Sequence, residues 1–333
     1  MAKPIGLPDF LPIIQPDIFR LVNSKGFDGS ALLPPRRYSG LLVLMKCIIN
    51  RRSQFSASHR YWLDELSPDE NQRLFGKCTQ LPGHGHNYVL TVSIEDELDP
   101  YGMVLNLSTA KEIIQREIID ELDFSYLNDA WPEFQTTLPT TENMARVIWH
   151  RLSPHLLITN VQINETPELW ADYKGHGMEG YLTVSTHFSA AHRLALPELS
   201  YEENYAIYGK CARPHGHGHN YQLEITVKGE IDARTGMIVD LVALQNAIAH
   251  HVIEPFDHTF LNKDIPYFSN VVPTAENIIV RICQLLQQPI QKIGATLHKV
   301  KIIESPNNSA EVFAKNLSLS SSDSTHSQEL VTR

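Results

Sequence analysis

Three histidines alternate along one short stretch, His215-Gly-His217-Gly-His219, four residues after Cys211. Side chains at positions i and i+2 of an extended strand point to the same face, so two of these imidazoles can bind one ion together. A third histidine at the end of another expected strand, His192, would complete a set of three. Three neutral imidazoles with an open fourth position are typical ligands of a catalytic zinc, not of a structural one. The stretch therefore predicts a reactive metal centre.

The same pattern occurs twice in the chain, which distinguishes it from an incidental pair of surface histidines. Phe55, Cys78 and His84 each have a counterpart of the same type 133 residues further on. Pro82 stands where His215 stands in the second copy, so we expect His215 to be a loop neighbour and not a ligand. The predicted ligand sets are His59, His84 and His86 in the first copy, and His192, His217 and His219 in the second.

One cysteine in each copy, Cys78 or Cys211, comes six residues before the first histidine of the metal strand. A thiolate beside a dication has a lowered pKa, which makes it a nucleophile or a base. The alternative is a buried small hydrophobic residue, the common state of a free cysteine. We favour a catalytic role because both copies place the cysteine in a polar loop after a lysine. Cys47 and Cys283 lack such neighbours and are expected in the core.

An Asp–His pair, Asp257-His258, follows a predicted helix in the second copy. Such a pair can relay a proton, with the aspartate fixing the tautomer of the imidazole. The first copy reads Asp123-Phe124 at the same place, and phenylalanine cannot transfer a proton. We therefore expect one of the two copies to be chemically incomplete.

A glutamate, Glu165 or Glu304, ends the last predicted strand of each copy on its otherwise apolar face. A carboxylate there can accept two parallel hydrogen bonds from a heterocycle with adjacent N–H groups. A solvated strand end is an equally good interpretation of either glutamate alone. In each copy, threonines lie at the start of the predicted helix that comes before this strand. They could assist the carboxylates or could only cap the helices; they are Thr140, Thr141 and Thr274.

The predicted elements recur in the same order in both copies, as strands interrupted by a pair of amphipathic helices. Strands that alternate apolar and polar residues, with helices that are apolar on one face, indicate antiparallel sheets with helices on one face, an α+β arrangement. The predicted parts are an extension over 1–44, a first unit over 45–166, a linker over 167–180, a second unit over 181–313 and a disordered tail over 314–333.

The composition favours an ordinary globular protein of about two domains for 333 residues, with 42% hydrophobic residues. A net charge of −10 argues against a nucleic-acid partner. Four cysteines without a CxxC pair are typical of a reducing cytosol. No segment reaches the ~18 apolar residues that a membrane span needs, and the start of the chain does not look like a signal peptide. We expect a cytoplasmic protein with no membrane partner.

The linked motifs F-S-A-x-H, G-K-C, H-G-H-N-Y, G-M-[VI] and P-T-x-E-N resemble the 6-pyruvoyl-tetrahydropterin synthase / 6-carboxy-tetrahydropterin synthase family over both copies, from about 45 to 313. The resemblance implies two tandem tunnelling-fold (T-fold) units, each a four-stranded antiparallel sheet with two helices on one face, and a homo-oligomer. It also implies two zinc tripods, catalytic thiols at Cys78 and Cys211, and a proton relay at Asp257 and His258, with Asp123 as a remnant. Glu165 and Glu304, helped by the threonines, would anchor a pterin ring.

The activity that this resemblance implies begins with 7,8-dihydroneopterin triphosphate, a small-molecule substrate. We expect the branch that loses triphosphate and acetaldehyde and forms 6-carboxy-5,6,7,8-tetrahydropterin, a precursor of queuosine; this preference comes from how common the branch is, and no residue supports it. The alternative is the 6-pyruvoyl branch, which eliminates triphosphate only. A non-catalytic pterin- or metal-binding scaffold is a second alternative, and Phe124 lends it weight. A zinc hydrolase has little support, because nothing matches HExxH.

Overall fold

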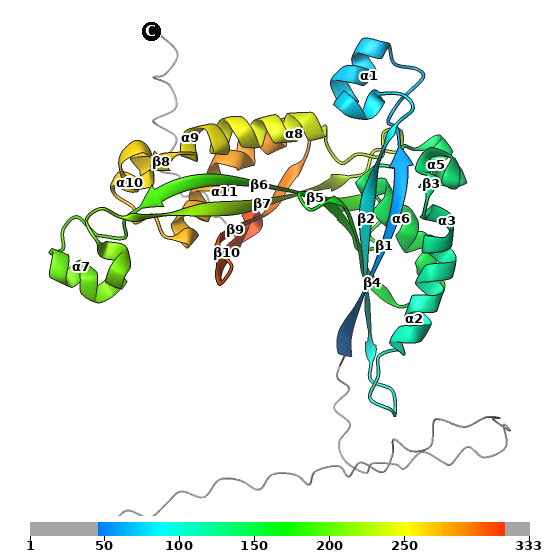
Figure 1. Ribbon diagram of the computed structural model, residues 1–333, viewed down its shortest axis with the longest axis horizontal. Coiled ribbons are helices and arrows are strands. Elements are labelled where there is room, and N and C mark those ends of the chain that lie inside the picture. Colours follow the sequence, from blue (N-terminus) through cyan, green and yellow to red (C-terminus); the bar gives the residue numbers. More distant parts are fainter. Residues whose placement is uncertain (1–45, 317–333) are drawn as a thin grey trace, which may run out of the picture. The chain divides into compact units, whose positions relative to one another are not determined.

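The computed structural model describes residues 46–316 (Figure 1). The predicted extension over 1–44 lies outside the described residues, as does the predicted tail from 317 onward. The first three residues assigned to that tail, Ala314–Asn316, form a 3₁₀ turn instead. Within residues 46–316, no helix is long and apolar enough to cross a bilayer. The cytoplasmic location remains a prediction from sequence.

The first unit is built on four antiparallel strands: β1 (Lys46–His59), β2 (His84–Glu97), β4 (Ile158–Thr166) and β5 (Leu169–Tyr173). Their buried residues alternate along each strand, as one covered face requires; on β2 they are Tyr88, Leu90, Val92 and Ile94. Figure 1 shows α2 (Leu107–Ile114) and α6 (Thr141–Leu152) beside these strands. The predicted antiparallel sheet and helix pair are confirmed in this unit.

The second unit repeats this plan with β6 (Glu179–His192), β7 (His217–Glu230), β9 (Thr296–Ser305) and β10 (Asn308–Phe313). Its two main helices are α8 (Leu241–Ile248) and α11 (Ala275–Lys292). Asp240 caps α8 by accepting a hydrogen bond from the backbone N–H of Ala243, and Thr274 caps α11 in the same way. The fold is therefore α+β, with two tandem T-fold units, as predicted.

One continuous sheet joins the two units, with strand order β10-β9-β7-β6-β5-β4-β2-β1-β3, in which β3 is the two-residue strand Ser125–Tyr126. The junction is the antiparallel pair β5–β6, in which Leu169 lies opposite Val184 and Tyr173 opposite Gly180. The prediction of a linker over 167–180 was wrong in this respect, because β5 lies within that range and is the fourth strand of the first unit. The sequence Leu169-Trp-Ala-Asp-Tyr173 is too short for its alternation to stand out.

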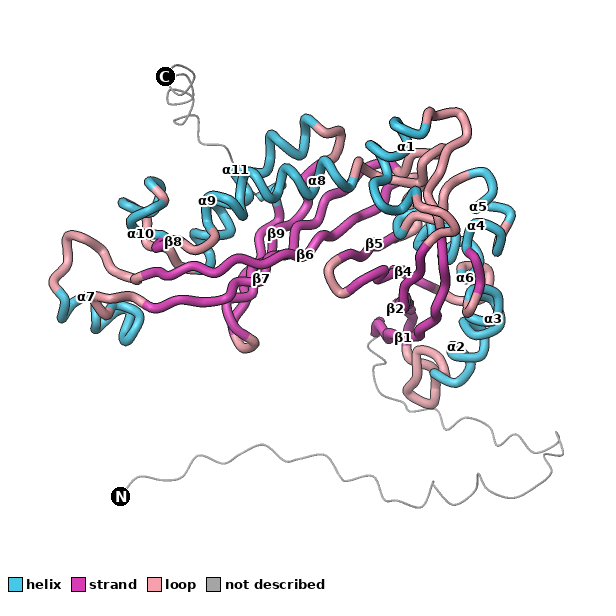
Figure 2. Tube along the Cα trace, turned by 45° about the horizontal axis from the view of Figure 1, so that its top comes forward, coloured by secondary structure: helices cyan, strands magenta, loops and turns pink. Residues whose placement is uncertain are grey.

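The polar loops that carry the cysteines contain short helices that the sequence interpretation missed. α1 (Pro68–Phe75) and α7 (Tyr201–Tyr208) each begin with a capping box, Ser67 with Glu70 and Ser200 with Glu203. The S-x-x-E spacing is visible in the sequence and was the available signal. Figure 2 shows α7 beyond the ends of β6 and β7. Each of these helices runs into a 3₁₀ turn that holds the cysteine, Gly76–Thr79 or Gly209–Ala212.

The remaining elements are short and follow the main helices in both units. After α2 and α8 come π-helical turns and one-turn helices: Gln115–Ile119 with α3 (Asp120–Leu122), and Ala249–Ile253 with α9 (Glu254–Phe256). Two-residue strands β3 (Ser125–Tyr126) and β8 (Thr259–Phe260) then run parallel to β1 and β6. Further short helices are α4 (Leu127–Ala130), α5 (Pro132–Thr136), α10 (Leu261–Asp264) and the 3₁₀ turn Pro266–Ser269.

Candidate functional site

Each predicted histidine trio comes together at one end of its sheet, where the first strand of the unit ends and the second begins. The register of β1 with β2 places His59 opposite His84, and that of β6 with β7 places His192 opposite His217. The Nε2 atoms of each of these pairs are 3.1 Å apart. With His86 or His219 added, the ligand atoms of each trio all lie within 4.8 Å of one another. His215 belongs to neither trio, as predicted from Pro82.

The hydrogen bonds of the trios leave Nε2 of the buried histidine free to bind a cation. His192 Nδ1 lies 2.7 Å from the carbonyl oxygen of Pro273, so Nδ1–H donates and Nε2 keeps its lone pair. Burial lowers the pKa of His59 to about 3, with neighbouring imidazoles adding to the effect. Burial also lowers the pKa of His192. Neutral imidazoles are the form that binds a metal ion.

Two buried nitrogen atoms test whether these residues fit a metal ion. His86 Nε2 and His219 Nε2 are buried and make no hydrogen bond among the described residues. Each faces a carboxylate oxygen, Glu165 Oε1 at 3.5 Å and Glu304 Oε1 at 3.6 Å. A buried polar atom without a partner is costly, and a cation bound by all three imidazoles would remove that cost. The donor set therefore fits a divalent ion such as zinc.

Neither cysteine belongs to a trio, and Cys78 lies next to the first one. Cys78 Sγ is 3.9 Å from His84 Nε2. The backbone N–H of Tyr61 donates to the Cys78 carbonyl, as that of Leu194 donates to the Cys211 carbonyl. These bonds fix each cysteine turn against the segment that follows the first ligand strand. Burial, and then the Glu165 carboxylate, raise the pKa of Cys78 to about 11 in the protein alone. The sequence predicts a lowered pKa for the cysteine thiol, and that prediction depends on a dication bound beside the thiol.

The two glutamates face the trios from the closing strands, and their surroundings differ. Glu165 is 9% exposed and its Oε2 accepts a hydrogen bond from Thr141 Oγ1 at 2.8 Å. The Tyr61 hydroxyl lies 3.4 Å from the same oxygen. Burial is the main cause that raises the pKa of Glu165. In the second unit, Leu194 and Ala275 stand where Tyr61 and Thr141 stand. Neither Leu194 nor Ala275 can donate a side-chain hydrogen bond to Glu304, and the Glu304 side chain is 17% exposed.

A cavity of about 200 Å³ opens beside the first trio, and both units line it. The first unit contributes Cys78, Thr141 and Glu165, among others. The second unit contributes side chains from the turn before α8 and from α8 itself, Met237, Leu241, Val242 and Gln245. The sequence interpretation missed this wall, because it depends on the β5–β6 junction between the units.

A further buried carboxylate, Glu142, holds the two units together at this cavity. Its Oε1 accepts a hydrogen bond from the backbone N–H of Ile238 at 3.1 Å. Burial raises the pKa of Glu142 to about 7, although this hydrogen bond opposes the shift. Thr140 caps α6 and donates to the carbonyl of Gly236, again across the units. Of the two roles open to Thr140, capping a helix and assisting a carboxylate, this geometry supports the cap.

The Asp–His pair forms as predicted, and His258 lines an open hollow together with His219 of its own unit, although no hydrogen bond or ion pair of the described residues joins it to the trio or the thiol. His258 Nδ1 lies 2.8 Å from Asp257 Oδ2, and the His258 side chain is 83% exposed. Among the described residues, that ring has no other hydrogen bond or ion pair. The backbone N–H of Ser189 donates to Asp257, and this is the first cause that lowers the pKa of Asp257.

Phe124 takes the backbone conformation of His258 in the first unit. Their φ angles are 58° and 57°, in the left-handed region that is uncommon for residues other than glycine. Asp123 accepts a hydrogen bond from the backbone N–H of Ser56 at 2.8 Å. The phenylalanine ring is 90% exposed. The first unit thus keeps the turn and loses the imidazole.

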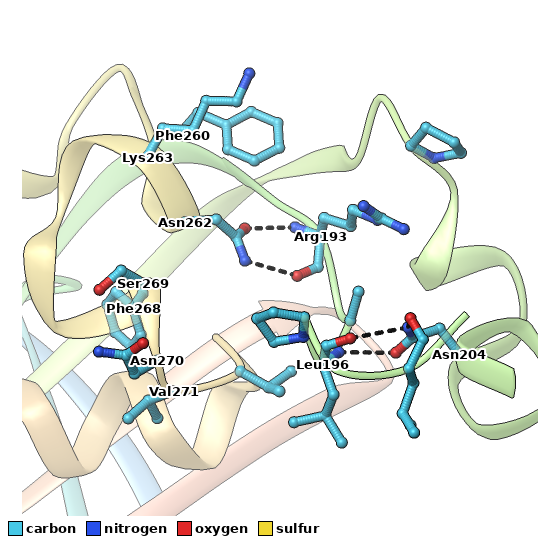
Figure 3. Close-up of a pocket in the computed structure, with 15 residues that line it drawn as sticks. Arg193, Leu196, Asn204, Phe260, Asn262, Lys263, Phe268, Ser269, Asn270 and Val271 are labelled. Atoms are coloured by element: carbon cyan, nitrogen blue, oxygen red, sulfur yellow. Dashed lines mark hydrogen bonds between the residues drawn. The ribbon is translucent and has the colours of Figure 1, made fainter. Parts of the chain in front are cut away.

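A second hollow lies in the second unit, between the segment after β6, α7 and residues 268–272 (Figure 3). The Asn262 side chain bonds both the N–H and the C=O of Arg193 across it, and Asn204 bonds Leu196 in the same way. Ala195 stands here where the first unit has Trp62. None of the histidines, cysteines or glutamates discussed above lines this hollow. Asn204 and Asn262 hold the backbone in place here.

Fold and site together define a class of protein: a two-unit T-fold protein in which each histidine trio faces a carboxylate, with a thiol beside the first trio. The family model for 6-pyruvoyl tetrahydropterin synthase matches residues 48–176 and again residues 181–315. The chain therefore belongs to the 6-pyruvoyl tetrahydropterin synthase family and carries two copies of the family's unit.

Individual relatives each match one such unit. The Homo sapiens 6-pyruvoyl tetrahydrobiopterin synthase is 47% identical over 134 residues, which are 40% of this chain and 91% of the human protein. The Haemophilus influenzae 6-carboxy-5,6,7,8-tetrahydropterin synthase is 30% identical over 122 residues, which are 30% of this chain and 85% of that protein. The solved Caenorhabditis elegans 6-pyruvoyl tetrahydropterin synthase is 34% identical, with a TM-score of 0.39, over 41% of this chain and 96% of that chain.

Proposed function

We propose that this protein is a zinc-dependent 6-pyruvoyl-tetrahydropterin synthase, which converts 7,8-dihydroneopterin triphosphate to the 6-pyruvoyl product with loss of triphosphate. The observation that carries the proposal is the meeting, in each unit, of three imidazoles and a glutamate, with Cys78 beside the trio of the first unit. The relatives support this branch over the 6-carboxy branch that we expected from sequence. Identity is 47% with the human 6-pyruvoyl enzyme and 30% with the bacterial 6-carboxy enzyme.

The roles of the residues follow from their chemistry and their neighbours. Glu165 and Glu304 would accept N–H groups of the pterin ring, which fixes the ring beside the trio. When bound, zinc would polarise the side-chain hydroxyls of the substrate and acidify the adjacent C–H. The thiolate of Cys78 or Cys211 would take that proton, and the electron pair would expel triphosphate from the neighbouring carbon.

Proton transfer in the later tautomerisations is assigned to Asp257 and His258. Because the His258 ring is exposed and no hydrogen bond or ion pair of the described residues joins it to the thiol of its own unit, we propose that the pair serves a site of a neighbouring subunit. The aspartate would hold the imidazole in one tautomer, so that Nε2 exchanges protons with the substrate. Asp123 is not assigned a proton-transfer role, because Phe124 follows it.

The test is turnover of 7,8-dihydroneopterin triphosphate with identification of the products. The proposal predicts triphosphate and a 6-pyruvoyl pterin, without acetaldehyde. Release of acetaldehyde with a 6-carboxy pterin would instead support the 6-carboxy branch. Binding of the substrate without any product would support a non-catalytic scaffold.

The two cysteines are tested separately by Cys78→Ala and Cys211→Ala, with zinc content measured as a control for folding. Loss of turnover in one variant identifies the unit that works, and partial loss in both assigns activity to both units. If both variants kept full activity, the cysteine assignment would be wrong. The localisation and the oligomeric state predicted above are separate from this test.

A further inference from the structure

The hollow of Figure 3, called the Arg193 hollow from here on, contains an arginine whose counterpart in the first unit is stacked on an indole. In the first unit, the Cζ atom of Arg60 lies 4.4 Å from the centre of the Trp62 ring. The equivalent pair 133 residues further on is Arg193 and Ala195, and both line the hollow. Guanidinium groups stack on flat aromatic faces. The first unit therefore supplies such a ring from its own chain, and the second has none at that position.

The two arginines are held in the same way, so the two units can be compared directly. An asparagine side chain bonds both the N–H and the C=O of each arginine, Asn128 in the first unit and Asn262 in the second. The Nε–H of each arginine donates to the carbonyl of the residue after the cysteine, at 2.8 Å and 2.9 Å. Among residues 46–316, the Arg193 guanidinium makes no other hydrogen bond or ion pair. Its flat face is fixed in place before any ligand binds.

The charges at this place also differ between the units. Lys263 lines the hollow where the first unit has Asp129, and Pro197 lines it where the first unit has Asp64. The lining therefore contains two cationic side chains and no carboxylate. The Nζ atom of Lys263 lies 5.1 Å from the centre of the Phe260 ring and forms no ion pair within the described part of the chain. In a protein with a net charge of −10, such a place favours an anion.

The size and the remaining walls of the hollow suit a small molecule. Its volume of about 310 Å³ is at the lower end of the range for ligand sites, about 300–1,000 Å³. Leu196, Val271 and Val272 contribute apolar surface. Asp264, which follows Lys263, is not part of the lining, and its Oδ2 accepts a hydrogen bond from the backbone N–H of Phe260 at 2.6 Å. An apolar body with one negative group would therefore find a partner for each of its parts.

We propose that the Arg193 hollow binds a small planar aromatic molecule that carries an anionic group. The ring stacks on the guanidinium of Arg193, as the Trp62 indole stacks on Arg60 in the first unit. The anionic group faces Lys263 at the rim. None of the trio histidines, the cysteines or the two facing glutamates lines this hollow. The site is thus separate from the site of the proposed function, and the inference does not rest on that function.

The probe is indole-3-acetate, titrated into the full-length protein as purified and measured by isothermal titration calorimetry. Two fragments of the probe separate the contributions of ring and charge. Indole carries the ring alone and should bind roughly 2- to 5-fold more weakly, because an ion pair at an exposed rim contributes little. Acetate carries the charge alone and should not compete with indole-3-acetate for the hollow.

Two substitutions copy the first unit into the second. Ala195→Trp places a ring of the chain itself on Arg193, so the variant should fold and should lose the binding of indole-3-acetate in the hollow. Lys263→Asp copies Asp129 and should weaken indole-3-acetate by roughly 5-fold, while the affinity for indole stays unchanged. A carboxylate bound at a histidine trio would remain bound in both variants, so the heat that Ala195→Trp removes measures the hollow.

Ile207→Trp is the matched control, because it adds a tryptophan to α7 at a position that is 59% exposed and outside the lining. It should keep the wild-type affinity. Circular dichroism and metal content check the folding of each variant. Absence of binding to the wild type, or wild-type affinity in Ala195→Trp, would overturn the proposal. Equal weakening of indole and indole-3-acetate by Lys263→Asp would also overturn it, since the charge would then have no part in recognition.

Discussion

The Nε2 atom of His219 and the Oε1 atom of Glu304 lie 3.6 Å apart, and the same pair in the first unit, His86 and Glu165, is 3.5 Å apart. In each unit, the second histidine of the HGH motif thus lies next to a carboxylate as well as to the other two imidazoles, and His192 Nε2 lies 3.8 Å from the same oxygen of Glu304. A metal ion on the trio and a substrate ring on the carboxylate would be neighbours. This relationship links the two halves of the proposed chemistry.

Replacing the carboxylates should weaken turnover without loss of metal. We expect Glu165→Gln or Glu304→Gln to lower kcat/KM in the working unit by roughly 10- to 100-fold, because a charge-assisted hydrogen bond is worth about 1.5–3 kcal/mol. Steady-state kinetics and zinc content measure the two effects. The glutamate variant that loses activity must belong to the same unit as the sensitive cysteine. A sensitive Cys78 together with a sensitive Glu304 alone would contradict the site as described.

His258→Phe copies a residue that the chain already uses in the same backbone conformation at Phe124. The variant should therefore fold normally and lose the proton relay. We expect kcat to fall by about 10²-fold or more, the usual contribution of general acid–base catalysis. Circular dichroism and ultracentrifugation serve as controls for folding and assembly. Unchanged kcat in a folded variant would show that the Asp–His pair has no part in the reaction.

Glu142 should make stability depend on pH. Its pKa is raised from 4.5 to about 7 by burial, with Glu165 adding to the shift and the Ile238 N–H and Thr140 opposing it. The folded state then binds more protons than the unfolded state between these values, so this group destabilises the fold as pH rises from 4.5 to 7. The full effect corresponds to about 3 kcal/mol.

Glu142→Gln keeps the acceptor for Ile238 and removes the titration. Denaturant unfolding from pH 4.5 to pH 7 should show that the variant gains stability relative to the wild type as pH rises. His59 also titrates, and its lowered pKa acts in the opposite direction, but it is common to both proteins. A constant difference between the two proteins across this range would refute the assignment.

Gly236→Ala should separate the two units. Its φ is 75°, and the added Cβ would lie 2.7 Å from Leu138 O, a backbone atom that cannot rotate away. Gly294→Ala carries a similar backbone penalty without a contact within 4 Å. We expect the free energy of unfolding to fall by about 1–3 kcal/mol more in Gly236→Ala than in Gly294→Ala, the typical cost of overpacking. Equal losses of unfolding free energy in the two variants would mean that the turn at Gly236 does not pack against Leu138 as described.

The sequence predicts the two units and the histidine trios because both depend on local spacing. Histidines at i and i+2 must share a strand face, and the 133-residue repeat excludes His215. Helix α1 and β5 were missed for different reasons. The capping box at Ser67 is a local signal in the sequence, whereas β5 is only five residues long and is stabilised by its neighbours β4 and β6.

Other features depend on contacts between residues far apart in the chain, so no local pattern could predict them. Glu142 is buried only because Ile238 of the second unit covers it, and the cavity wall has the same origin. The exposed position of His258 also escapes sequence reasoning. The Asp-His motif shows which residue stands at position 258, but the left-handed backbone conformation of His258 determines the direction of its ring.

The central claim is that each unit folds three imidazoles around one divalent ion. The most direct measurement is the metal content of the purified full-length protein by inductively coupled plasma mass spectrometry, for the wild type and for His84→Ala and His217→Ala. The account predicts about two zinc ions per chain, one for each complete trio, and about one in either variant. A wild-type protein that binds no transition metal after exposure to zinc, or variants that keep the wild-type content, would contradict it.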